Sequence, residues 1–202
     1  MARAKGTVIA STLAFLNEKL GKEGAVQLIE GLGAEHSALL KGPVLQGNWY
    51  PIDLLIKLVI AAEGKVAMPE KKKKTLAWEL GRFSAETGLK GIYKVFFKMA
   101  DISFIIKRAP HVWSSYYDSG TMQVLVAEPN KAIMRIAGFD QPSAILCDRV
   151  LGWMERTVEM SGGKHVANEP SGVRRPRRRF LRIPRRVGVM PLPINAILCY
   201  FS

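Results

Sequence analysis

The chain has 202 residues, of which 48% are apolar and 23% charged. This globular composition excludes an intrinsically disordered protein, and the length suits one domain with a sizeable core. No apolar run approaches the ~20 residues that span a bilayer, and the N-terminal residues carry no secretory-signal pattern. We therefore expect a cytoplasmic protein without a transmembrane segment.

The net charge of +13 is unevenly distributed along the chain. All 17 acidic residues lie at or before Glu169, whereas residues 170–202 contain eight of the 30 basic residues and no acid. Residues 1–169 thus carry 22 basic against 17 acidic residues, a net charge of +5. The sequence predicts a mildly basic body, residues 1–169, and a strongly basic tail, residues 170–202.

Helical spacing of apolar residues dominates the first half of the body. Leu13, Leu16 and Leu20 predict a helix over residues 7–20, which Gly21 would end. The same spacing predicts helices over residues 25–32, over residues 52–62 after Pro51, and over a segment that carries Leu76, Leu80, Phe83 and Thr87.

Glycine and proline interrupt the pattern that follows. Gly81, Gly88 and Gly91 would weaken helices, so we expect them to serve a close backbone approach or a break between helices. A further pair of helices is expected over residues 102–107 and 112–117, separated by Pro110.

The pattern becomes β-like after the turn signal Asp118-Ser119-Gly120. Residues 121–126 and 132–137 predict a hairpin, a long helix follows from about Asp140, and residues 164–167 predict one more strand. The predicted fold class is α+β: N-terminal helices packed on a small antiparallel sheet, with a long helix between the hairpin and the last strand or strands.

Motifs of catalysis and metal binding do not occur in the sequence. It contains no phosphate-binding glycine loop, nucleophile elbow or zinc-ligand spacing, and His36, His111 and His165 have no companion at ligand spacing. Cys147 and Cys199 alone make neither a disulfide framework nor a zinc site. We therefore assign no catalytic residue and no metal site, and expect a protein that is not an enzyme.

Aromatic residues of the helical half are the candidate ligand-binding residues. A pocket lined with them would suit a flat or apolar ligand, and an ordinary hydrophobic core is the alternative. Tyr116 and Tyr117 precede a tight turn and are the best candidates for a polar role, because a buried tyrosine hydroxyl needs a partner. The predicted ligand-binding residues are Tyr93, Phe97, Trp113, Tyr116 and Tyr117.

Several separated stretches of residues 5–169 resemble the myxobacterial paralogous domain family of unknown function. The stretches are Lys5-Gly6-Thr7-Val8, Trp49-Tyr50-Pro51, Gly81-Arg82-Phe83-Ser84-Ala85-Glu86, Arg108-Ala109-Pro110, Trp113 with Tyr116-Tyr117-Asp118-Ser119-Gly120, Gly138-Phe139 and Leu151-Gly152-Trp153. That family is similar to the group of haem-nitric-oxide-binding domains, vinyl-reductase-type domains and transport-particle subunits. The resemblance implies helices packed on an antiparallel sheet, and a binding, sensing or assembly module.

The resemblance does not extend to haem or metal. The haem-binding branch carries a Tyr-x-Ser-x-Arg motif, and this chain has Thr121 where the arginine of that motif would stand. Metal-binding relatives use cysteines near the C-terminal strands, where this chain has none between Cys147 and Cys199. We expect no cofactor.

The tail departs from the endings expected of the relatives and is predicted to be poorly ordered. Arg/Pro-rich sequence is typical of a GC-rich gene translated out of frame, and one choice of synonymous codons for residues 171–184 encodes an ending close to the expected one after a one-base shift. We therefore favour a frameshift origin for the tail. The rival interpretation is a native arm that binds nucleic acid or an anionic surface through Arg174, Arg175, Arg177, Arg178 and Arg179.

The sequence thus favours a single binding domain over residues 1–169. We expect a non-enzymatic small-molecule-binding or protein-interaction domain, a sensor or scaffold in bacterial signalling, whose partner is a hydrophobic small molecule or another protein. A homodimer is expected from the resemblance. The alternative is a nucleic-acid- or anionic-surface-binding protein that acts through its arginine-rich tail, provided that the tail is genuine.

Overall fold

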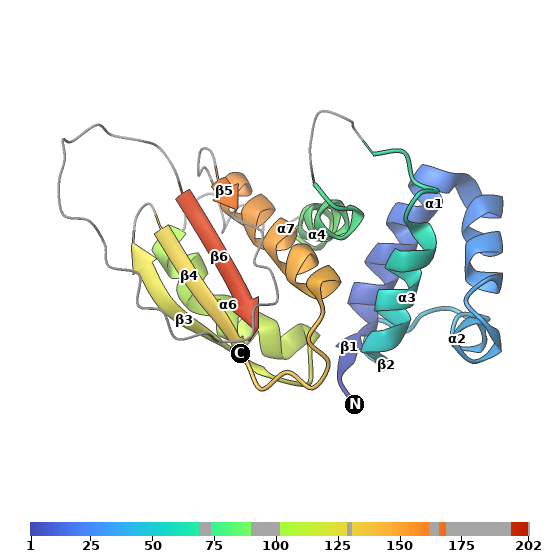
Figure 1. Ribbon diagram of the computed structural model, residues 1–202, viewed down its shortest axis with the longest axis horizontal. Helices are drawn as coiled ribbons and strands as arrows, with labels where there is room; N and C mark the ends of the chain where they lie inside the picture. Colours follow the sequence, from blue (N-terminus) through green and yellow to red (C-terminus); the bar gives the residue numbers. More distant parts are fainter. Residues whose placement is uncertain (69–73, 90–101, 129–130, 162–165, 169–194, 202) are drawn as a thin grey trace.

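The fold is of the α+β class, as predicted (Figure 1). The computed structural model describes residues 1–68, 74–89, 102–128, 131–161, 166–168 and 195–201. A four-stranded sheet lies at one end, helices α7 and α4 occupy the centre, and the N-terminal helices lie at the other end (Figure 1). None of the described helices is both long and apolar enough to cross a membrane.

The N-terminal layer consists of three helices and a short β-ribbon. Helix α1 (Gly6–Glu30) is kinked at Gly21, whose φ of 72° and ψ of 169° interrupt the helix where the sequence predicted a stop. Helix α2 (Ala34–Ala38) is short, and α3 (Ile52–Ala62) matches its predicted range. Strands β1 (Arg3–Lys5) and β2 (Trp49–Pro51) pair antiparallel beneath these helices.

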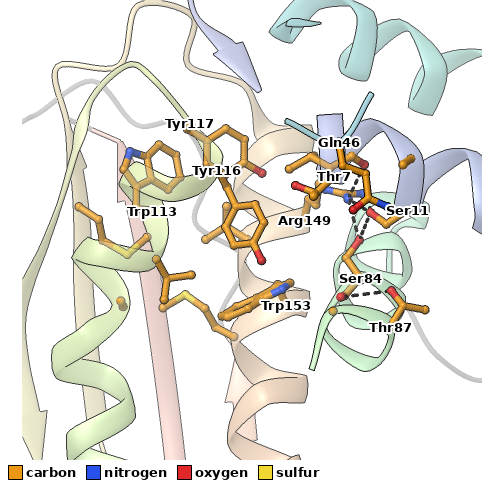
Figure 2. Close-up of a pocket in the computed structure, with 18 of the residues that line it drawn as sticks. Thr7, Ser11, Gln46, Ser84, Thr87, Trp113, Tyr116, Tyr117, Arg149 and Trp153 are labelled. Atoms are coloured by element: carbon orange, nitrogen blue, oxygen red, sulfur yellow. Dashed lines mark hydrogen bonds between the residues drawn. The ribbon is translucent and has the colours of Figure 1, made fainter. Parts of the chain in front are cut away.

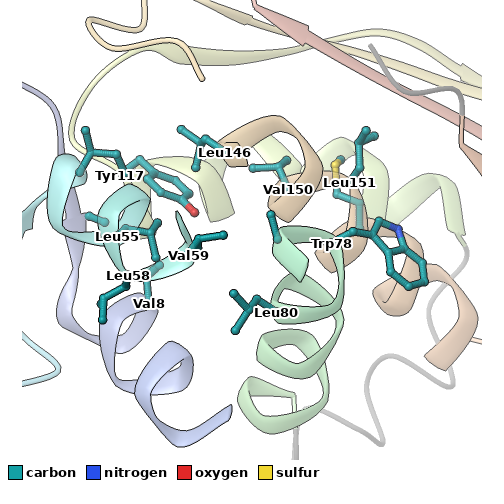
Figure 3. Close-up of a cluster of buried hydrophobic side chains, with 14 of the residues drawn as sticks. Val8, Leu55, Leu58, Val59, Trp78, Leu80, Tyr117, Leu146, Val150 and Leu151 are labelled. Carbon is teal, nitrogen blue, oxygen red and sulfur yellow. The ribbon is translucent and has the colours of Figure 1, made fainter. Parts of the chain in front are cut away.

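Apolar side chains from four helices form the core that joins this layer to the centre. Leu55, Leu80 and Leu146 are completely buried, and they converge from α3, α4 (Leu76–Gly88) and α7 (Ala144–Met160) (Figure 3). Val8 adds the contribution of α1. Burial of each such side chain stabilises the fold by roughly 1.5–3 kcal/mol. This core therefore holds the N-terminal helices against α4 and α7.

Helix α6 (Ile102–Tyr116) runs through Pro110 without a break, so the predicted division into two helices is wrong. A proline inside a helix removes one backbone hydrogen bond. Burial of Ile106 and Trp113 on either side of Pro110, together with packing of α6 against β3, offsets that loss.

The sheet has the strand order β3-β4-β6-β5. Strands β3 (Thr121–Glu128) and β4 (Lys131–Ala137) form the predicted antiparallel hairpin. Strand β6 (Asn195–Phe201) is parallel to both β4 and β5 (Val166–Asn168), so the sheet is mixed where we expected antiparallel strands throughout. Helix α7 accounts for the common direction of β4 and β5, because a crossover helix between two strands brings the chain back in the same direction.

Part of the tail belongs to this sheet. Residues 195–201 were expected to be poorly ordered together with the rest of residues 170–202, whereas the structure places them in β6. Residues 170–194 and 202 lie outside the described residues.

Two glycines let α4 and α7 cross in backbone contact. A Cβ atom on Gly81 would lie 2.0 Å from the carbonyl oxygen of Arg149, and one on Gly152 would lie 2.0 Å from that of Trp78. Real Cβ atoms essentially never come this close to another atom. Of the two roles expected for Gly81, a close backbone approach or a break between helices, the structure shows the close approach, and Gly152 completes it from the other helix.

We expect Gly81→Ala and Gly152→Ala each to lower the free energy of unfolding by more than about 2 kcal/mol, because the added methyl must push two backbones apart. Gly88→Ala is the matched control, since a Cβ there has no atom within 4 Å. Urea denaturation followed by circular dichroism measures the effect. Equal stability of Gly81→Ala and Gly88→Ala would contradict the crossing.

Candidate functional site

A pocket of about 500 Å³ opens between α1, α4, α6 and α7, with Met122 of β3 at one wall (Figure 2). Its described lining combines aromatic and aliphatic side chains with a cluster of polar ones. The lining residues are Thr7, Val8, Ala10, Ser11, Ala14, Gln46, Ser84, Thr87, Gly88, Ala109, Val112, Trp113, Tyr116, Tyr117, Met122, Arg149, Val150, Trp153 and Met154.

The aromatic wall contains three of the five predicted ligand-binding residues. Trp113, Tyr116 and Tyr117 all line the pocket, and Trp153 of α7, which was not predicted, faces Tyr116 at a ring-centroid distance of 6.5 Å. Tyr93 and Phe97, the other two predicted residues, lie outside the described residues.

Trp113 is held in one orientation by the turn that follows α6. Its indole N–H donates to the carbonyl oxygens of Ser119 at 3.1 Å and Gly120 at 3.2 Å. Its ring stacks on Tyr117 with centroids 4.4 Å apart and meets the edge of Phe139 at 5.7 Å. A ring fixed in this way gives the pocket a preformed wall.

Arg149 of α7 forms the polar end of the pocket. Its side chain is 3% exposed, and its Nη2 donates to Ser84 Oγ at 2.7 Å, Ser11 Oγ at 3.2 Å and the Val8 carbonyl at 3.3 Å. Figure 2 shows the hydroxyl of Tyr117 pointing toward it. Arg149 thus joins α7 to α1 and α4 at the edge of an apolar space.

A close contact at the start of α1 brings the rim of the pocket into place. A Cβ atom on Gly6 would lie 2.0 Å from the carbonyl oxygen of Leu45, and the Gly6 N–H donates to the carbonyl of Asn48 at 2.7 Å. The loop that contains Leu45 and Asn48 therefore packs directly on the first turn of α1. It places exposed Gln46 at the rim, next to Thr7 in the lining.

Burial shapes the ionisation of the polar end. It raises the pKa of the Tyr117 phenol although the nearby Arg149 cation acts in the opposite direction, so Tyr117 remains a neutral hydroxyl. Burial also lowers the pKa of Arg149, against the opposing effect of Tyr117. The described lining contains no aspartate or glutamate that would offset the arginine charge.

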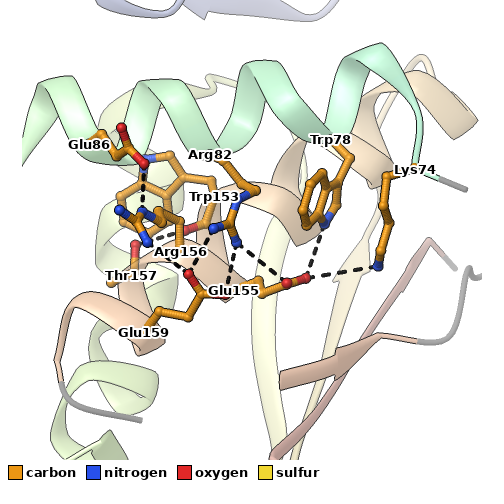
Figure 4. A network of polar contacts seen from close by, with 9 residues as sticks. All are labelled: Lys74, Trp78, Arg82, Glu86, Trp153, Glu155, Arg156, Thr157 and Glu159. Atoms are coloured by element: carbon orange, nitrogen blue, oxygen red, sulfur yellow. Dashed lines mark hydrogen bonds and ion pairs between the residues drawn. The ribbon is translucent and has the colours of Figure 1, made fainter. Parts of the chain in front are cut away.

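The opposite face of the α4–α7 pair carries an ion-pair network (Figure 4). Arg82 of α4 donates to both carboxylate oxygens of Glu159 at 2.9 and 2.8 Å, and the Trp78 indole donates to Glu155 at 3.1 Å. Burial raises the pKa of Glu155, whereas hydrogen bonds from Arg82 and Arg156 outweigh burial and lower the pKa of Glu159. The network clamps the two helices on the side away from the pocket.

Two residues of α7 differ from the sequence prediction. The apolar stripe of Leu146, Val150 and Trp153 predicts that Glu155 lies on the opposite, polar face of this helix. Glu155 is nevertheless only 7% exposed, because α4 covers that face and supplies the Trp78 indole as a donor. Arg149 was not singled out at all. Its position three residues after Leu146 and four before Trp153 puts it on the apolar stripe, and a cation there was the signal that could have identified it.

The other predicted sites have different outcomes. Arg174, Arg175, Arg177, Arg178 and Arg179 lie outside the described residues. His36 is buried and its Nε2 lies 2.9 Å from Asp53 Oδ2, away from the pocket lining. Within the described ranges, no group of three or more histidine, cysteine or acidic side chains is arranged to hold a metal ion.

No family model, curated protein or solved structure matches the chain in comparisons with known proteins. The resemblance to the myxobacterial family, the frameshift origin of the tail and the homodimer therefore remain predictions.

Asp118 ties the turn after Tyr117 to the N-terminal strand. The backbone N–H and the Nε of Arg3 both donate to its carboxylate, and Asp118 N–H donates to the Arg3 carbonyl at 3.2 Å. Although partial burial alone would raise it, these hydrogen bonds lower the pKa of Asp118. The ionised form therefore stabilises the fold above the ordinary aspartate range, and this contribution is lost as the pH falls through the lowered pKa.

We expect Asp118→Asn to cost at most about 1 kcal/mol at pH 7, since Arg3 is half exposed to solvent. The difference from the unsubstituted protein should shrink below the usual aspartate pKa of 3.8. Urea denaturation at a series of pH values from 7 to 3 measures it. A difference that stays constant over this range would contradict the ionic role.

Proposed function

We propose that this domain is a non-enzymatic small-molecule-binding module that holds a largely apolar ligand in the pocket between α6 and α7, in a sensor or scaffold role. One observation carries the proposal. The pocket has a volume of about 500 Å³ and an aromatic wall built from Trp113, Tyr116, Tyr117 and Trp153.

The size and composition of the pocket support a ligand. Small-molecule sites are typically clefts of 300–1,000 Å³ with mainly apolar walls and a few fixed polar groups. Protein interiors otherwise pack with few voids larger than a water molecule. A space of this size beside a well-packed core therefore favours an occupant over a packing defect.

The chemistry of the described lining favours binding over catalysis. It contains no histidine, cysteine or carboxylate, the groups that most often act as general bases or activated nucleophiles. The rim includes the exposed residues Ala14, Gln46 and Gly88, which give a ligand a route from solvent.

A substitution that fills the pocket is expected to prevent binding. Val112 lies in the wall, so Val112→Trp places a large ring in the cavity and should weaken binding of the neutral dye N-phenyl-1-naphthylamine at least tenfold. Val26→Trp makes the same chemical change at a 46% exposed position of α1 outside the lining and serves as the matched control. Dye fluorescence titration measures both.

Native mass spectrometry of the purified protein adds a test that needs no chosen ligand. A retained small-molecule mass in the unsubstituted protein and in Val26→Trp, absent from Val112→Trp, is the expected result. Equal dye affinity in the two variants, or no saturable binding by the unsubstituted protein, would contradict the proposal.

A further inference from the structure

One nitrogen of a buried cation has no partner in the pocket. The Nη1 atom of Arg149 is buried and makes no hydrogen bond with the described residues. Its neighbour Nη2 faces three acceptors, more than its two hydrogens can serve. The guanidinium is therefore held firmly on one side and unsatisfied on the other.

The partners of Arg149 leave its charge largely uncompensated. They are the hydroxyls of Ser11, Ser84 and Tyr117 and the carbonyl of Val8, all neutral groups. Tyr117 beside it is a neutral phenol, since burial raises the pKa of its hydroxyl. A buried charge normally occurs with an opposite charge, because removing it from water costs several kcal/mol.

Further groups at this end of the pocket suit an anion. The Thr7 hydroxyl oxygen is buried and also lacks a hydrogen-bond partner among the described residues. Thr7 belongs to the first turn of α1, where the helix dipole places partial positive charge. Aromatic and aliphatic side chains, among them Trp113, Trp153 and Met154, supply the apolar part of the wall.

We propose that the ligand is an amphipathic monoanion, a carboxylate with an apolar body, whose carboxylate binds Nη1 of Arg149 and the Thr7 hydroxyl while its body lies along the aromatic wall. This inference rests on the proposed function and narrows it to one class of ligand. Carboxylates suit the site because an arginine–carboxylate contact is a charge-assisted hydrogen bond and ion pair at once.

A purely structural role of Arg149 predicts different behaviour. If its bonds to Ser11 and Ser84 were its whole purpose, replacement by methionine would destabilise the fold by removing those bonds, although the two serine hydroxyls would still bond to each other. If the cation is kept for a ligand, methionine removes an uncompensated buried charge, and the stability of the ligand-free protein should stay the same or increase.

Matched probe pairs test the charge preference of the unsubstituted full chain. Decanoate and 1-decanol share a chain length, as do 4-phenylbutanoate and 4-phenyl-1-butanol, and each pair differs in the anionic group. Isothermal titration calorimetry should give at least tenfold tighter binding of one carboxylate than of its alcohol, the size expected for a charge-assisted hydrogen bond. Equal affinities within both pairs would overturn the inference while leaving the proposed function intact.

Arg149→Met then assigns the preference to one residue. We expect this variant to bind the alcohols as before and to lose the preference for the carboxylates. Arg135→Met, the same substitution on β4 outside the lining, should keep it. A preference that survives in Arg149→Met would overturn the inference, and failure of all four probes to bind the unsubstituted protein would count against the proposed function as well.

Should Arg149→Met not fold, nuclear magnetic resonance of the unsubstituted protein decides the question. Decanoate should shift the guanidinium resonances of a buried, slowly exchanging arginine, and 1-decanol should leave them in place. Identical spectra with the two compounds would overturn the assignment to Arg149.

Discussion

The backbone contact between α4 and α7 at Gly81 and Gly152 is the constraint on which the rest of the structure depends. Each glycine lies where a methyl group would strike a carbonyl oxygen of the facing helix, 2.0 Å away. That oxygen belongs to Arg149 in one case and to Trp78 in the other. The contact therefore fixes the position of Arg149 relative to α4 and the position of Trp78 relative to α7.

The two faces of this pair have opposite electrostatics. On one face three cations, Lys74, Arg82 and Arg156, pair with three carboxylates, Glu86, Glu155 and Glu159. On the other face Arg149 meets only neutral acceptors and an apolar space. Helix α7 thus contributes to a charge-balanced ion-pair network and also to a polar site in which the cation Arg149 has no opposite charge beside it among the described residues. This polar site lies beside the aromatic wall.

Periodicity identified most helices and the β3–β4 hairpin because those elements depend on local spacing of apolar residues. The common direction of β4 and β5 depends on a crossover through α7, which spacing does not encode, and the continuity of α6 through Pro110 depends on packing against β3. Trp113, Tyr116 and Tyr117 could be identified as pocket residues because aromatics beside a tight turn are conspicuous. Arg149 can be identified only once the burial of its helix face is known. Trp153 lines the pocket because the crossing at Gly81 and Gly152 fixes the position of α7.

A crystal structure of the protein with 10-bromodecanoate would show whether the pocket holds an amphipathic carboxylate. Anomalous scattering from bromine locates the apolar end, and the density locates the carboxylate. We expect bromine between α6 and α7 beside Trp113 and Trp153, with the carboxylate at hydrogen-bond distance from Arg149 Nη1. Bromine elsewhere, or a space already filled by the protein's own side chains, would contradict it.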